Sequence, residues 1–173
     1  MIPEKNGHAA KLPAQQSARS QTRKVDGVHD VEAIAARLRD ARSLPELLAV
    51  SFDAFEAIRV LARGSEDIVP SLFAAFMTAA DAAVEGREAM TIAPSLSPAP
   101  GGTLVSSSPT AFAGIDRITD ALAALGALLD ERLADAADRA VISGDRAACQ
   151  EAAEAGRRIH QLMARDEHDR HLR

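Results

Sequence analysis

The stretch that decides the fold runs from Ser43 to Gly86 and reads SLPELLAVSFDAFEAIRVLARG followed by SEDIVPSLFAAFMTAADAAVEG. In both halves apolar residues recur at steps of three and four, the spacing that places them on one face of an α-helix. The connection between the halves is short, so we expect two antiparallel neighbouring helices. The core that this pair builds is expected to include Leu48, Phe52, Phe55, Phe73 and Phe76.

Local signals set the ends of these two helices. Ser43 and Glu46 have the spacing of a capping box. In this motif the serine side chain accepts from the backbone N–H of the glutamate, and the glutamate side chain accepts from the backbone N–H of the serine. Gly64 suits the end of the first helix. The second helix is either capped by Ser65 or starts near Val69. The later start is an alternative because Pro70 lacks a backbone N–H and would interrupt a helix that had already begun. Gly86 is expected to close or kink the second helix.

The residues before this stretch divide into an arm and a short helix. Residues 1–27 carry a net charge of +3 and all three lysines, without apolar periodicity. Such a segment buries too little surface to offset its ordering entropy, so we expect a disordered basic arm. Apolar spacing then predicts a helix from Val28 to about Arg42. Residues 28–92 would therefore form a three-helix unit.

The residues after this stretch predict a linker and a second helical unit. Residues 93–111 are rich in Pro, Ser and Gly, which is typical of a linker or a long loop. Residues 112–165 predict a helical hairpin, with a fourth helix over about 115–141 and a fifth from about Arg146 to Met163. Residues 166–173 form a charged tail.

The fourth helix contains a segment that is apolar on every side. Residues 121–129 read ALAALGALL, and a helix of this kind must be buried all round, in the centre of a bundle or in a seam between copies. Within it, Gly126 suggests a close crossing of two helix backbones. We predict an oligomer interface at Ile118, Leu122, Leu125, Gly126 and Leu129.

Composition supports an all-α fold class. Alanine, the strongest helix former, occurs 37 times among 173 residues, while aromatic residues make up 3%. We expect about five helices, arranged as a helical bundle or as two packed hairpin units. The sequence shows no apolar run of membrane-spanning length, and its single cysteine excludes an intramolecular disulfide, so we expect a cytoplasmic protein without a membrane partner.

Few residues in the sequence are candidates for a metal-binding or catalytic site. His168 and His171 share a helix face three residues apart, which makes them weak candidates for metal ligands. Cys149 lies among alanines and is interpreted as a buried, unreactive thiol. We predict neither a cofactor nor a catalytic site, and therefore a protein that is not an enzyme.

Three hypotheses on function follow. The first is a non-catalytic interaction or scaffold protein that binds a protein partner or associates with itself through the fourth helix. The second is a regulatory protein that contacts nucleic acid through the basic arm, because residues 28–156 carry a net charge of −10 and do not suit that role. The third is a binder of a small apolar ligand at the phenylalanine cluster.

Overall fold

Five α-helices and one short 3₁₀-helix make up the part of the chain that the computed structural model describes, residues 27–96 and 114–170. Side chains are described for residues 27–96 and 114–164. The elements are α1 (Gly27–Asp40), α2 (Leu44–Ser65), η1 (Pro70–Leu72), α3 (Phe73–Thr91), α4 (Ile115–Arg139) and α5 (Ser143–Arg170). No strand occurs in these two ranges, and the predicted all-α fold class is confirmed.

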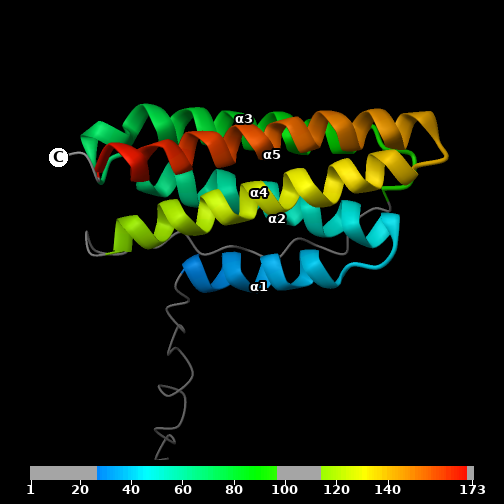
Figure 1. Ribbon diagram of the computed structural model, residues 1–173, viewed down its shortest axis with the longest axis horizontal. Helices are drawn as coiled ribbons and strands as arrows, with labels where there is room; N and C mark the ends of the chain where they lie inside the picture. The colour runs from blue at the N-terminus through cyan, green and yellow to red at the C-terminus, as the bar shows by residue number, and fades with distance from the viewer. Residues whose placement is uncertain (1–26, 97–113, 171–173) are drawn as a thin grey trace, which may run out of the picture.

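Helices α2 to α5 form a four-helix bundle, and α1 lies against one side of it (Figure 1). Around the bundle α2 contacts α3, α3 contacts α5, α5 contacts α4, and α4 contacts α2. Helix α1 contacts both α2 and α4. Buried residues from all five helices form one hydrophobic cluster. The hairpins α2–α3 and α4–α5 therefore share a single core.

Helices α3 and α4 run in the same direction, because both are antiparallel to α5. Asp145 at the start of α5 binds Ser95, just after the end of α3, and further along α5 Arg158 pairs with Glu85. On the other side of α5, His160 donates from Nδ1 to the carbonyl oxygen of Ala123, in the first half of α4. The end of α3 and the start of α4 consequently lie at opposite ends of the bundle (Figure 1).

The predicted cap of α2 forms with a small shift. Ser43 Oγ accepts from the N–H of Glu46 at 3.4 Å, as expected for an N-cap. The carboxylate of Glu46 reaches back one residue further than in a capping box and accepts from the N–H of Arg42 at 3.1 Å. The helix continues one residue beyond Gly64, to Ser65, with no left-handed backbone there.

Gly86 does not close α3, which continues to Thr91. The glycine is needed because the ring of Phe55 lies against it: a Cβ at this position would stand 2.6 Å from Phe55 Cζ and 2.9 Å from Ala155 Cβ. Of the five residues expected in the core, three are fully buried: Leu48, Phe55 and Phe76. Phe52 is partly buried with Arg87 over its ring, and Phe73 at the start of α3 is 41% exposed.

Helices α4 and α5 approach each other closely at two facing glycines. A Cβ on Gly126 would lie 2.9 Å from the carbonyl oxygen of Gly156, and a Cβ on Gly156 would lie 2.9 Å from that of Gly126. No side chain fits between the backbones at this point. The small residues of α5 thus allow α4 to sit in contact with it. Within the apolar segment 121–129 this contact helps to bury Leu122, Leu125, Gly126 and Leu129, whereas Ala124 stays exposed, so the segment is not buried all round as the sequence predicts.

The α5 helix is longer than the sequence predicts at both ends. It begins at Ser143 and continues to Arg170, so the backbone of residues 166–170 in the predicted tail is helical. Near its start, the buried carboxylate of Asp145 accepts from the N–H of Ser95 at 2.9 Å and from its hydroxyl at 2.7 Å. Within residues 27–96 and 114–170, no helix combines the length and apolar character needed to cross a membrane.

Candidate binding site at one end of the bundle

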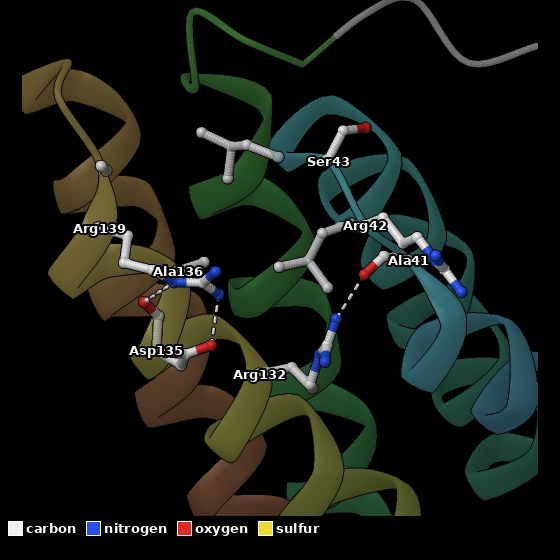
Figure 2. Close-up of a pocket in the computed structure, with 10 residues that line it drawn as sticks. Ala41, Arg42, Ser43, Arg132, Asp135, Ala136 and Arg139 are labelled. Atoms are coloured by element: carbon white, nitrogen blue, oxygen red, sulfur yellow. Dashed lines mark hydrogen bonds and ion pairs between the residues drawn. The ribbon is translucent and has the colours of Figure 1, made fainter.

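A pocket of about 400 Å³ opens where the α1–α2 connection meets the last turns of α4 (Figure 2). We call it the arginine pocket. It is lined by Ala41, Arg42, Ser43, Leu44, Leu47, Arg132, Asp135, Ala136, Arg139 and Ala140. The two segments are about ninety residues apart in the chain, and the pocket exists because α4 packs along α1 and α2.

Arg132 lies between α4 and the α1–α2 connection (Figure 2). Its Nη2 donates to the carbonyl oxygen of Ala41 at 2.6 Å, which satisfies a backbone acceptor just after the end of α1. Its Nε is buried, and no acceptor for it exists among the described residues. A guanidinium has five N–H donors, so only some of the donors of Arg132 are occupied by hydrogen bonds within the described residues.

The other charged groups of the pocket leave it positive. Arg139 folds back on its own helix, pairing with the carboxylate of Asp135 and donating from Nε to the Asp135 carbonyl oxygen at 3.1 Å. Arg42 is exposed, and its guanidinium points away from Arg132 (Figure 2). Three arginines and one aspartate give the lining a net charge of +2. This contrasts with the acidic character of the body as a whole.

Two exposed aliphatic side chains follow the pocket directly. Val141 is 94% exposed and Ile142 is 47% exposed, in the connection between α4 and α5. We call this pair the turn patch. The Arg146 guanidinium holds the connection by donating from Nη2 to the Ala140 carbonyl oxygen at 2.8 Å. Because Ala140 also lines the arginine pocket, the apolar patch and the positive pocket adjoin.

Two other grooves occur on the described surface. One, of about 360 Å³, lies between α1 and α4 and has a mainly aliphatic floor. The other, of about 380 Å³, lies between α3 and α5 and is rimmed by four glutamates, of which Glu85 pairs with Arg158. Neither groove has an orphaned polar group in its wall.

The described residues hold no group of three or more His, Cys, Asp and Glu side chains placed to bind a metal ion. The candidates His168 and His171 fall outside the residues whose side chains are described, so their proposed role stays a prediction. Cys149 is buried, and burial, aided by the nearby charge of Asp145, raises the pKa of its thiol to about 11. His160 is engaged with the α4 backbone.

The structure places the predicted interface residues inside the chain's own core. Each is buried, and the list is Ile118, Leu122, Leu125, Gly126 and Leu129. The four apolar ones belong to the hydrophobic cluster of this chain, as expected for the first of the two alternatives, the centre of a bundle. Association of copies through these residues stays a prediction. The basic arm falls almost entirely outside the described residues, so its contact with nucleic acid stays a prediction.

The chain matches no protein-family model, no curated protein and no solved structure. Its function has to be argued from its own geometry.

Sequence reasoning missed the arginine pocket. Arg132 is next to the buried Leu133 and flanks the apolar stripe of α4. That position signals a side chain at the edge of a helix contact. A second available signal was the pair of aliphatic residues Val141 and Ile142 at the predicted end of the fourth helix, which the structure places in the connection after Arg139.

Proposed function

We propose that this protein is a non-catalytic interaction protein of the cytoplasm, and that a segment of a protein partner docks on the end of the bundle formed by the turn patch and the arginine pocket. The observation that carries the proposal is the exposure of Val141 and Ile142 next to a positive pocket lined by Arg132, whose guanidinium makes one hydrogen bond within the described residues. Interfaces combine apolar contact area with a few polar anchors in this way.

The chemistry of this end face favours a protein segment over the other two hypotheses. Two aliphatic side chains offer nothing to a phosphate backbone, which is recognised by several unpaired cations. An apolar small molecule would need an enclosed apolar pocket, whereas Phe55 and Phe76 fill the core and line none of the described grooves.

Selection from a phage-displayed random peptide library tests the proposal. The full-length protein is expected to enrich a family of peptides, and the double variant Val141→Ser with Ile142→Ser is expected to lose them because the apolar contact is gone. Phe73→Ser is the matched control, since this exposed aromatic residue lies at the opposite end of the bundle. Thermal unfolding of each variant establishes that the fold is kept.

Two outcomes decide the proposal. If nothing is enriched, or if the enriched peptides bind the double variant as well as the natural protein, the end face is not the docking site. Light scattering at high protein concentration tests whether the partner is a second copy of this chain. A dimer that forms at high concentration and disappears in the double variant would show that the docked segment belongs to a second copy.

A further inference from the structure

The arginine pocket contains a guanidinium that the fold does not saturate. Arg132 uses one donor of Nη2 on the Ala41 carbonyl oxygen. Its Nε has no acceptor in the described part of the chain but is itself buried, so a group that enters from solvent meets the Nη groups of this guanidinium. The start of α2 contributes little to an anion, because Ser43 and Glu46 already cap it. Any negative group that enters the pocket is therefore held by arginine side chains.

We infer that the arginine pocket receives the carboxylate of an aspartate or glutamate side chain of the docked partner, with Arg132 as its main contact and the turn patch covering an apolar neighbour of that residue. This inference rests on the proposed function and names the chemistry of its partner. A guanidinium binds a carboxylate through two parallel hydrogen bonds, and such charge-assisted bonds are among the strongest in proteins.

The charge of the pocket matches a single carboxylate better than a phosphate group. Arg139 is already paired with Asp135, and Arg42 points outward, so one guanidinium remains for the ligand. The acidic body does not prevent the contact at physiological salt, because charges more than about 8 Å apart are largely screened in water. The charges that act on the ligand are then the +2 of the lining and the nearby Glu46 carboxylate, which accepts from the N–H of Arg42.

Asp135 acts in this arrangement as an internal competitor. Its carboxylate occupies Arg139, a second guanidinium of the same pocket. Replacing Asp135 by asparagine frees Arg139 and raises the charge of the pocket from +2 to +3. The substitution should therefore strengthen the binding of an acidic segment, which a purely structural role of the ion pair would not produce.

The test uses the peptides enriched in the library selection, each compared with a copy in which its acidic residues are replaced by the corresponding amides. Fluorescence anisotropy should show the amide copy binding the natural protein about 10-fold more weakly, the loss of one charge-assisted contact. Arg132→Lys, which keeps a donor for Ala41, should lower affinity for the acidic peptide about 5- to 10-fold and leave the amide copy unaffected. Asp135→Asn should raise affinity for the acidic peptide by about 3-fold or more.

Arg63→Gln is the matched control, because this exposed arginine pairs with Glu66 and Asp81 away from the pocket and should change neither affinity. Equal binding of the acidic peptide and its amide copy would overturn the inference while leaving the proposed function intact. The same holds if Arg132→Lys and Asp135→Asn leave the ratio of the two affinities unchanged. Failure of the selection itself would instead remove the proposed function.

Discussion

Ser51 shows how a single polar group can work against the core. It lies in the middle of α2 with no exposed surface, and its Oγ has no hydrogen-bond partner among the described residues. Leaving a buried hydroxyl without a partner costs free energy, about 1–3 kcal/mol in mutational data. The helix thus carries an avoidable penalty at this position.

We expect Ser51→Ala to raise the free energy of unfolding by about 1 kcal/mol, because the substitution removes the unpaired hydroxyl and improves helix propensity. Urea denaturation monitored by circular dichroism measures the change. Ser71→Ala, at an exposed position, is the control and should have an effect within about 0.5 kcal/mol of zero. A destabilised Ser51→Ala would mean that the hydroxyl has a partner after all.

Glu56 is the residue through which acid should weaken the fold. Its carboxylate accepts two bonds from Arg59, at 2.6 and 3.0 Å, and one from Arg87 of α3 at 2.5 Å. The hydrogen bonds and charge of Arg59, joined by those of Arg87, hold the pKa of Glu56 below its ordinary value of 4.5 despite partial burial. The folded state therefore binds a proton at this carboxylate less readily than the unfolded state does.

A depressed carboxylate pKa contributes stability that is present above pH 4.5 and is lost as the pH falls through the folded-state value. We expect Glu56→Gln to cost about 0.5–1 kcal/mol at neutral pH, a modest amount because the pair is partly exposed. The difference from the natural protein should shrink in denaturation series carried below pH 4.5. A difference independent of pH would assign the loss to shape and not to charge.

At the scale of elements, the contact between α4 and α5 brings two helix backbones close together. Gly126 and Gly156 face each other, and either added methyl group meets backbone atoms at 2.8–2.9 Å. Backbone cannot rotate aside as a flexible side chain does, so the helices must separate. Other contacts along the two helices would then loosen as well.

We expect Gly126→Ala and Gly156→Ala each to lower the free energy of unfolding by about 1–3 kcal/mol, although alanine is the better helix former. Both act on the same contact, so the double variant should lose less than the sum of the single losses. Chemical denaturation of the four proteins in this cycle measures the coupling. Strict additivity would show that the two methyl groups are accommodated independently.

Elements are also where sequence reasoning succeeds and fails most clearly. The apolar spacing in α2 and the cap at Ser43 are local properties, so they were predictable from a few neighbouring residues. The role of Gly86 depends on Phe55, which belongs to another helix, and a Gly inside a helical pattern was therefore mistaken for an end. The arginine pocket was not predictable for the same reason, because Arg132 contacts Ala41 only after α1, α2 and α4 have packed together.

At the scale of the whole molecule, Cys149 reports on opening of the core. Its thiol is buried, and its pKa of about 11 keeps it protonated at neutral and mildly alkaline pH. Only the thiolate reacts readily with disulfide reagents. Reaction therefore requires the α5 region to open.

We expect a disulfide reagent to label the native protein at about pH 8 far more slowly than the urea-unfolded chain, with a rate that follows the opening equilibrium. The absorbance of the released thiolate measures the rate. Gly126→Ala should speed labelling of the native protein by the factor by which it raises the opening equilibrium constant. Equal rates for native and unfolded chains would contradict the buried position of Cys149.

Small side chains dominate the interior: alanine makes up 18 of the 39 buried hydrophobic residues in the described ranges. An alanine exposes little apolar area when the chain unfolds, and exposed apolar area is what raises the heat capacity of the unfolded state. The heat-capacity change of unfolding should then lie below the usual value of about 12–15 cal/mol/K per residue. A low value reduces the curvature of stability against temperature, so this bundle is expected to have a broader stability curve than a bundle of the same size built on larger side chains.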